Sequence, residues 1–180
     1  GRSVAGGLTV RRTLAAIFTA MKERVSKVVV VGSPIVGSSL NFLLKLAGRR
    51  PIAYVLFNNM WAFRAGYHLL APLYSRDKHW AEMMDRDMSK LTLESFFKSI
   101  ASLRRTDLRP RLNEVKIPAM GMYGDRDVVV HPMQWKPMLD GIPNTRVERF
   151  STAGHFIMLD EPQLFMDKLR NFLDGEEQAS

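Results

Sequence analysis

Short apolar runs mark three expected strands in this sequence. Four consecutive valines occupy positions 28–31 and end at a Gly-Ser-Pro turn sequence. A second run lies near 118–123, and a third, at 145–150, alternates between polar and apolar residues. An uninterrupted β-branched run is typical of a strand that is buried on both faces, as in a parallel sheet covered by helices.

Apolar residues recur with helical spacing over the long segment between the first two runs. Residues 35–110 are rich in Leu, Phe, Met, Trp and Arg. The spacing predicts helices there at 38–48, 52–70, 78–89 and 92–104. Glycine and proline provide the expected breaks, at Gly48, Pro51, Pro72 and Pro110. Thr92 is a suitable N-cap, because the apolar residues that follow it fall on one helical face.

Helices are also expected on either side of the strands. The pattern predicts one within 8–24, a short one that ends at Gly141, and a last one with Asp160 as N-cap and Pro162 in its first turn. Strand and helix thus alternate at both ends of the chain, which predicts the α/β class with a parallel sheet and right-handed crossovers. We expect a single domain over residues 1–180 with a helical insertion at 35–110.

The composition argues against several classes of function. None of the 180 residues is cysteine, which excludes disulfides and thiolate metal sites and suits a reducing, cytoplasmic location. The formal net charge is +8, but the basic residues are scattered and form no nucleic-acid motif, so we expect no nucleic-acid partner. The most apolar stretch, 51–63, is shorter than a transmembrane helix. The composition does not indicate an oligomeric state.

Titratable side chains follow two successive expected strands. Asp125 and Asp127 come directly after the strand near 118–123, and His155 follows the strand at 145–150. Ligands of open parallel sheets bind at the carboxyl ends of the strands. A carboxylate behind a histidine fixes its tautomer, and the histidine can then act as a general base. Each residue alone also has a plainer interpretation, as turn chemistry or as a loop corner.

The remaining polar and aromatic residues give weaker signals. His68 and His131 are isolated, whereas His79, Glu82 and Asp85 share one helical face, which we interpret as a solvated stripe rather than a metal site. No phosphate-binding or dinucleotide-binding motif is present, and we expect neither a metal nor a cofactor. Three aromatic residues are candidates for a substrate pocket, or equally for the core of the helical segment: Trp61, Phe63 and Tyr67.

The segment from Val115 to Leu173 resembles the C-terminal part of the α/β-hydrolase family. The matching stretches read IPAMGMYGDRDVVV, STAGHFIMLDEPQLF and LRNFL. The resemblance implies a parallel-sheet α/β-hydrolase fold that is incomplete on its N-terminal side. It also implies that Asp127 is the acid and His155 the base of a Ser-His-Asp triad, and that residues 35–110 form the family's helical lid.

In this family the nucleophilic serine precedes the acid and the histidine. The chain opens with Gly-Arg-Ser-Val-Ala, which is close to the G-x-S-x-G elbow with Ala in the last place. Ser3 is therefore the expected nucleophile, and the backbone N–H of Val4 is the expected oxyanion donor. The alternative is a coincidental Gly/Ser-rich start. Ser33 and Ser151 also follow strands but lack an elbow, and we find no stretch that would supply the second oxyanion donor.

We therefore expect an esterase-like serine hydrolase that acts on a small-molecule ester or related acyl substrate. The apolar helical segment suits a medium-sized apolar substrate, with or without a negative charge that would meet Arg49, Arg50 and Arg64. Two alternatives stay open. One is a non-catalytic fragment or member of the same fold that acts by binding, and the other is a peripheral membrane protein that uses the helices of 42–72. Dehalogenases and epoxide hydrolases share the scaffold but use an Asp nucleophile.

Overall fold

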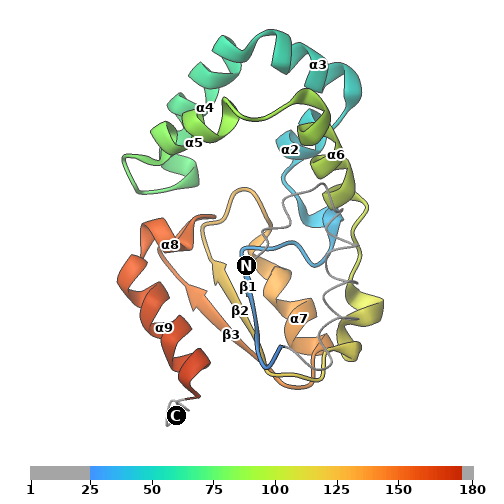
Figure 1. Ribbon diagram of the computed structural model, residues 1–180, viewed down its shortest axis with the longest axis vertical. Helices are drawn as coiled ribbons and strands as arrows, with labels where there is room; N and C mark the ends of the chain where they lie inside the picture. Colours follow the sequence, from blue (N-terminus) through green and yellow to red (C-terminus); the bar gives the residue numbers. More distant parts are fainter. Residues whose placement is uncertain (1–24, 176–180) are drawn as a thin grey trace.

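The computed structural model describes residues 25–175 of the protein (Figure 1). Strands β1 (Val28–Val31), β2 (Ala119–Gly124) and β3 (Thr145–Phe150) form a parallel sheet in the order β1-β2-β3. Val28 pairs with Ala119, which in turn pairs with Thr145. The expected strands are confirmed to within one residue, and the α/β class with a parallel sheet is confirmed as well.

Strand β2 lies at the centre of two hydrophobic cores. All six of its residues are buried, and alternate side chains point to opposite faces of the sheet. On one face Tyr123 packs with Met138 of α7 (Trp135–Gly141). On the other face Met120 and Met122 pack with Phe172 of α9 (Pro162–Asp174). Burial on both faces explains why this strand reads as a continuous apolar run.

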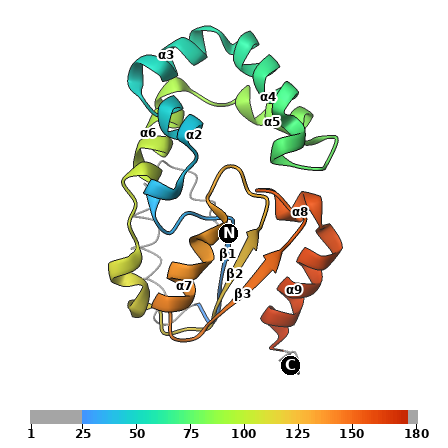
Figure 2. The ribbon, with the colours of Figure 1, turned by 180° about the vertical axis from the view of Figure 1, so that it is seen from behind.

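A helical arch, defined here as residues 42–104, lies between β1 and β2 in the chain. Figures 1 and 2 show it above the carboxyl ends of the strands. A short 3-10 turn, Gly37–Ser39, leads into it, and a second one, Arg109–Glu114, comes after it. Its helices are α2 (Phe42–Ala47), α3 (Arg50–Asn58), α4 (Met60–Tyr74), α5 (Trp80–Met88) and α6 (Leu93–Arg104).

The start of α6 agrees with the sequence pattern. The hydroxyl oxygen of Thr92 accepts a hydrogen bond from the backbone N–H of Ser95, and the Ser95 hydroxyl accepts one from the N–H of Thr92. This reciprocal capping box satisfies two donors that the first helical turn leaves without intrahelical partners. The prediction of Thr92 as an N-cap is confirmed.

The helix expected at 52–70 is wrong in its bounds, because two helices occupy this stretch. The backbone of Asn59 leaves the helical region (φ −125°, ψ 46°) between α3 and α4. The side-chain amides of Asn58 and Asn59 donate to carbonyl oxygens four residues earlier, as asparagine does where it competes with helix. Conversely, Pro72 does not end the helix. It lies in the last turn of α4, where it removes a single backbone hydrogen bond.

The last helix also begins differently from the prediction. Glu161 occupies the N-cap position of α9, and Asp160 ends the preceding short helix α8 (Ile157–Asp160). The carboxylate of Asp160 is instead hydrogen-bonded to Gly154 and to the segment that follows α4. Pro162 is in the first turn of α9, as expected.

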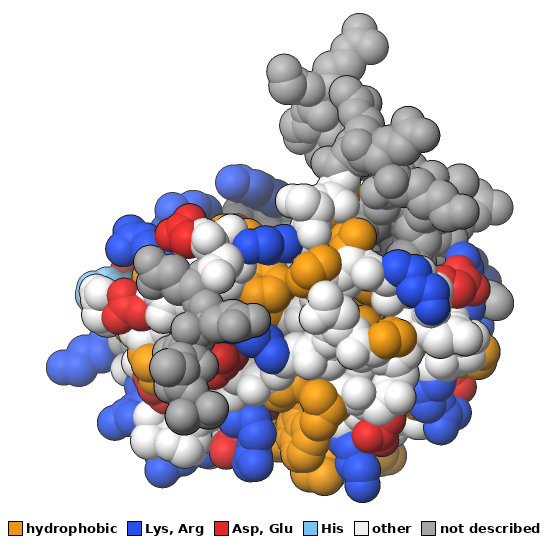
Figure 3. All heavy atoms as spheres, turned by 90° about the horizontal axis from the view of Figure 1, so that it is seen from below, with side chains coloured by type: hydrophobic (Ala, Val, Ile, Leu, Met, Phe, Trp, Pro, Cys, Tyr) orange, Lys and Arg blue, Asp and Glu red, His pale blue; other side chains and the backbone are white. Residues whose placement is uncertain are grey.

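The face of the molecule away from the arch carries mixed charges. In the view from below, Lys and Arg side chains alternate with Asp and Glu side chains around the rim, and apolar side chains lie between them (Figure 3). The described basic residues on this face do not gather into a single patch. Within residues 25–175, no helix combines the length and the apolar character that a membrane crossing requires.

Candidate active site

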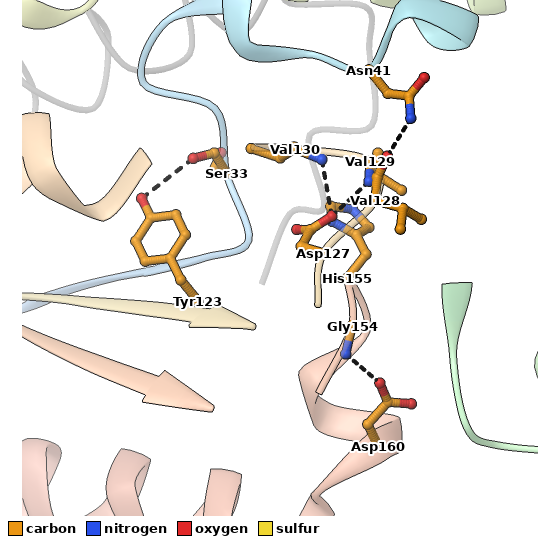
Figure 4. Close-up of polar contacts among 10 residues, drawn as sticks. All are labelled: Ser33, Asn41, Tyr123, Asp127, Val128, Val129, Val130, Gly154, His155 and Asp160. Atoms are coloured by element: carbon orange, nitrogen blue, oxygen red, sulfur yellow. Dashed lines mark hydrogen bonds and ion pairs between the residues drawn. The ribbon is translucent and has the colours of Figure 1, made fainter. Parts of the chain in front are cut away.

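Asp127 and His155 meet at the carboxyl edge of the sheet (Figure 4). Asp127 follows β2 and His155 follows β3, and these strands are parallel neighbours. The Nδ1 atom of His155 lies 2.8 Å from Oδ2 of Asp127. The side chain of Asp127 is only 3% exposed, whereas that of His155 is 24% exposed. The pair therefore has a buried carboxylate and a partly open imidazole.

Backbone groups hold the carboxylate of Asp127 in place. Its Oδ1 accepts hydrogen bonds from the N–H groups of Val129 and Val130, at 2.7 and 2.9 Å. A buried carboxylate is destabilising unless it is hydrogen-bonded, and here both oxygens have donors. Because an ionised carboxylate only accepts, the Nδ1 atom of His155 carries the proton in this pair. In this tautomer of the imidazole, the Nε2 atom carries a lone pair that can accept a proton.

The loops that carry the pair approach each other through Gly124. A Cβ atom at this position would lie 2.1 Å from the carbonyl oxygen of Gly154 and 2.5 Å from that of Ala153. Two backbone hydrogen bonds join the loops, from Asp125 N to Phe150 O at 2.9 Å and from Arg126 N to Ala153 O at 3.1 Å. The glycine of the Gly-Asp-Arg-Asp motif thus permits the close contact that brings acid and base together.

Asp125 belongs to a separate surface ion pair. Both of its carboxylate oxygens accept from the guanidinium of Arg149, each at 2.9 Å. The same guanidinium lies 5.5 Å from the ring centroid of Trp135. Of the two aspartates in the motif, Asp127 is therefore the one that contacts His155.

The loop after β1 packs against the imidazole. Gly32 has a positive φ of 52°, and the position of a Cβ there is 3.5 Å from both Cε1 and Nδ1 of His155. The next residue, Ser33, accepts a hydrogen bond at its carbonyl oxygen from the hydroxyl of Tyr123. Ser151, the other strand-end serine, is exposed.

His155 opens into a cavity of about 280 Å³ between the sheet and the helical arch. The sheet side of the cavity is formed by Asn41, Val128, Val129, His155 and Phe156. Its arch side is aromatic and methionine-rich, with Phe63, Tyr67, Tyr74, Trp80, Met84, Met88 and Phe96. None of these lining residues is Lys, Arg, Asp or Glu. Such a cavity suits an apolar group of a small molecule.

The structure places two of the three expected pocket residues at this cavity. Phe63 and Tyr67 are one helical turn apart on α4 and both line it. Trp61 does not line this cavity, and the residue is 76% exposed. Trp61 precedes Phe63 by two positions, which is about 200° around a helix, so the two side chains lie on opposite faces. Trp80 also lines the cavity, which the sequence pattern did not indicate. Its ring stacks on that of Tyr74, with ring centroids 5.1 Å apart.

The hydroxyl of Tyr67 is bound by Asp85 of α5. Burial of the hydroxyl and this hydrogen bond raise the pKa of Tyr67 to about 12. Asp85 also accepts from Arg64 at 2.5 Å and contacts Nε2 of His68 at 3.0 Å. The Tyr67 hydrogen bond, followed by that of His68 and the charge of Arg64, lowers the pKa of Asp85. The ring of Tyr67 thus lines the cavity, while its hydroxyl group is hydrogen-bonded to Asp85.

Two residues of the expected polar stripe, Asp85 and His79, have separate partners. Asp85 is bound by residues of α4 rather than by His79, which pairs with Asp77 at 3.3 Å. Over residues 25–175, no group of His, Asp and Glu side chains is arranged to hold a metal ion. The expected nucleophile Ser3 and oxyanion donor Val4 lie outside the described residues.

Comparison with known proteins gives several relatives, although no family model matches the chain. A 2-hydroxy-6-oxononadienedioate/2-hydroxy-6-oxononatrienedioate hydrolase of Dechloromonas aromatica is 32% identical over 93 residues, which are 50% of this chain and 32% of that protein. The AB hydrolase superfamily protein YclE of Bacillus subtilis is 35% identical over 71 residues, 39% of this chain and 25% of that protein. The chain thus spans about a third or less of these curated relatives.

Solved structures share the fold over most of this chain. An esterase from Exiguobacterium antarcticum superposes with a TM-score of 0.73 at 18% identity and covers 94% of this chain and 63% of its own. A bromoperoxidase from Bacillus anthracis gives 0.72 at 18% identity, over 91% of this chain and 63% of its own. A hydrolase from Pseudomonas aeruginosa gives 0.70 at 20% identity, over 88% and 59%. The chain therefore has the α/β-hydrolase fold, and the curated proteins that it resembles over part of their length are named as hydrolases.

Proposed function

We propose that the protein hydrolyses a neutral, apolar ester or related acyl substrate through a Ser-His-Asp triad. The observation that carries this proposal is the hydrogen bond between buried Asp127 and His155, with the imidazole lining an apolar cavity. The arrangement gives a base whose tautomer is fixed on one side and whose other nitrogen can reach a substrate.

The nucleophile in this scheme is Ser3, as the family resemblance implies. His155 Nε2 takes the hydroxyl proton while the serine oxygen attacks the acyl carbon. Backbone N–H groups, that of Val4 among them, stabilise the oxyanion of the tetrahedral intermediate. The imidazolium then protonates the leaving alcohol as the C–O bond breaks. Water, deprotonated by His155, attacks the acyl-enzyme, which releases the acid and returns the proton to the serine.

Asp127 keeps its negative charge throughout this cycle. It orients the ring through Nδ1 and stabilises the imidazolium that forms when Nε2 is protonated. Two backbone N–H groups already bind its other oxygen. The carboxylate is therefore in position before the substrate arrives, and little reorganisation is needed during the reaction.

The cavity favours a neutral acyl group over an anionic one. The name of the Dechloromonas aromatica relative describes a substrate with two carboxylates, but no Lys or Arg of residues 25–175 lines this cavity. Arg64 is paired with Asp85, and Arg50 lies 5.8 Å from the ring centroid of Phe97 on α6. We therefore assign Arg49, Arg50 and Arg64 no role in substrate charge. In this proposal the insertion at 35–110 acts as a lid on a single hydrolase domain.

Substitutions in the triad test the proposal. In the full-length protein, Asp127→Asn should lower kcat/KM for p-nitrophenyl butyrate by about 10⁴-fold, because the ring loses its fixed tautomer. Ser3→Ala and His155→Ala should cause losses of similar size. Initial rates of p-nitrophenolate release measure all three.

His79→Ala is the matched control. His79 also pairs with an aspartate, but its side chain is 82% exposed and lies outside the cavity lining. Its replacement should leave the rate within about twofold, as for a surface residue without a catalytic contact. Unchanged activity in His155→Ala would reject the triad, whereas an unmodified full-length protein that hydrolyses no ester would favour the binding-only alternative.

A further inference from the structure

Asp160 connects the loop of His155 to the helical arch. Its Oδ2 accepts a hydrogen bond from the N–H of Gly154 at 2.7 Å. Its Oδ1 accepts two more, from the hydroxyl of Ser75 and from the N–H of Arg76, both at 2.6 Å. Figure 4 shows Asp160 below Gly154, which directly precedes His155. One carboxylate therefore joins segments that are 85 residues apart in the sequence.

The contacts with Ser75 and Gly154 are partly buried, whereas the one with Arg76 is exposed. Ser75 is 5% exposed, and Gly154 is buried. A Cβ atom on Gly154 would lie 2.9 Å from the carbonyl oxygen of Tyr74, the last residue of α4. The end of α4 thus lies directly against the backbone that carries His155. Hydrogen bonds to a carboxylate are stronger than those between neutral groups, so they hold this approach firmly.

We infer that Asp160 is a positioning residue, which fixes the backbone before His155 and transmits the placement of the arch to the base. The inference rests on the proposed function, because it assigns Asp160 a purpose only if His155 is the base. Tyr74, at the end of the same helix, lines the cavity. A shift of α4 that accommodates a ligand therefore reaches Gly154 through Ser75, Arg76 and Asp160.

The neighbouring Glu161 provides a contrast within the same turn. Its Oε1 accepts from the hydroxyl of Thr152 at 2.6 Å. This bond also lies on the His155 loop and is also partly buried, but it involves neither Gly154 nor the arch. Removal of the Glu161 charge thus shows the effect of a general loss of loop stability. Removal of the Asp160 charge shows, in addition, the effect of breaking the connection between Gly154 and the arch.

The decisive variant is Asp160→Asn, with Glu161→Gln as the matched control. Asparagine keeps the shape of the side chain but replaces one acceptor oxygen with an NH₂ group, which cannot accept from Gly154 or Ser75. In the full-length protein, kcat should fall by roughly 10- to 100-fold while KM changes little, since a misplaced base affects the reaction step. Glu161→Gln should keep both constants near their original values, and Asp160→Glu, which restores two acceptors, should recover part of kcat.

A second measurement does not depend on activity. ¹⁵N NMR of the His155 ring nitrogens reports which of them carries the proton, and amide exchange reports the N–H groups of Gly154 and Arg76. In Asp160→Asn both amides should exchange about tenfold faster or more, and the Nδ1–H tautomer of His155 should lose population. If the amides exchange faster but the tautomer and kcat stay unchanged, Asp160 is only structural and the inference is wrong.

A milder variant covers the case in which Asp160→Asn does not fold. Ser75→Ala removes one donor from the arch side and leaves the bond from Gly154 in place. It should give a smaller loss in kcat and a smaller change in the tautomer, and no change in either would contradict the link to the arch. A His155→Ala variant that remains active would instead reject the proposed function. Even in that case, the tautomer of His155 in Asp160→Asn would show whether Asp160 positions the ring.

Discussion

Two glycines next to the Asp127–His155 pair make different demands on the backbone. Gly32 has φ +52°, a conformation that disfavours any residue with a Cβ, although the space around it permits ordinary contacts at 3.4 to 3.5 Å. Gly124 has no such conformational demand, but a Cβ there would overlap the backbone of the His155 loop at 2.1 Å. One glycine is required by its dihedral angle and the other by the contact between loops.

Alanine at these positions should therefore have unequal effects. Gly32→Ala should lower the free energy of unfolding by about 1–2 kcal/mol through left-handed strain, and the tautomer of His155 should stay as it is. Gly124→Ala should cost about 3 kcal/mol through overpacking and should separate the loops. Urea unfolding and ¹⁵N NMR of the imidazole measure the two effects. Equal losses in both variants, with His155 undisturbed, would contradict the role given to Gly124.

At the scale of single residues, the sequence predicts which side chains lie at the end of a strand but not which ones are joined through space. Asp127 and His155 come directly after apolar runs, so the topology of a parallel sheet is enough to bring them together. Asp160 has the local pattern of a helix N-cap because it precedes Pro162. Its actual partners, Ser75 and Arg76, lie in the segment after α4, and no local pattern connects them to it.

At the scale of elements, the strands are predicted better than the helices of the arch. Strand β2 is buried along its whole length and β1 is a run of four partly buried valines, so both carry a clear apolar signal, whereas α4 has a single buried residue, Tyr67. A helix with few buried residues shows little difference between an apolar and a polar face. Its ends and its inward face are therefore hard to predict from the sequence. Asn58 and Asn59 were the available signal for the break between α3 and α4, and helical spacing from Phe63 would have excluded Trp61 from the cavity.

The contact between α4 and α5 should depend on pH through Asp85. Interactions with Tyr67, His68 and Arg64 place the pKa of Asp85 below its ordinary value of 3.8 in the folded protein. A lowered pKa means that the unfolded chain binds the proton more readily, so the stabilisation is present above pH 3.8 and is lost as the pH falls through the folded-state pKa. The free energy of unfolding of the unmodified protein should therefore decline over this acidic range.

Asp85→Asn should make that decline shallower, as measured by denaturant unfolding at a series of pH values from about 5 to about 2.5. Glu94→Gln is the control. Glu94 also has a lowered pKa, caused by its hydrogen bond and ion pair with Lys98, but both partners belong to α6 and are exposed. An exposed pair within one helix contributes little. A pH profile that Asp85→Asn leaves as steep as before would show that this cluster does not stabilise the arch.

At the scale of the whole molecule, the sequence predicts the parallel sheet and the helical segment above it, but not the cavity between the two. The α/β pattern and the helical segment are each visible in the apolar spacing. The cavity depends on contacts between the layers: Asn41 donates to the carbonyl oxygen of Val128 at 2.6 Å, and Phe156 packs with Trp80 at a centroid distance of 5.7 Å. Such contacts join residues far apart in the chain, which local periodicity does not encode.

The cavity as a whole should determine the length of the acyl chain that is accepted. Met84 of α5 lines it opposite the sheet, so Met84→Trp should fill part of the 280 Å³ and exclude long chains. We expect kcat/KM for p-nitrophenyl octanoate to fall by about 10- to 200-fold, the discrimination typical of a methylene that no longer fits, while the value for the acetate stays nearly constant. Met133→Trp is the control, because Met133 is 46% exposed and outside the lining. If both variants hydrolyse the ester series with the original profile, the acyl chain does not bind in this cavity, even if His155 proves to be the base.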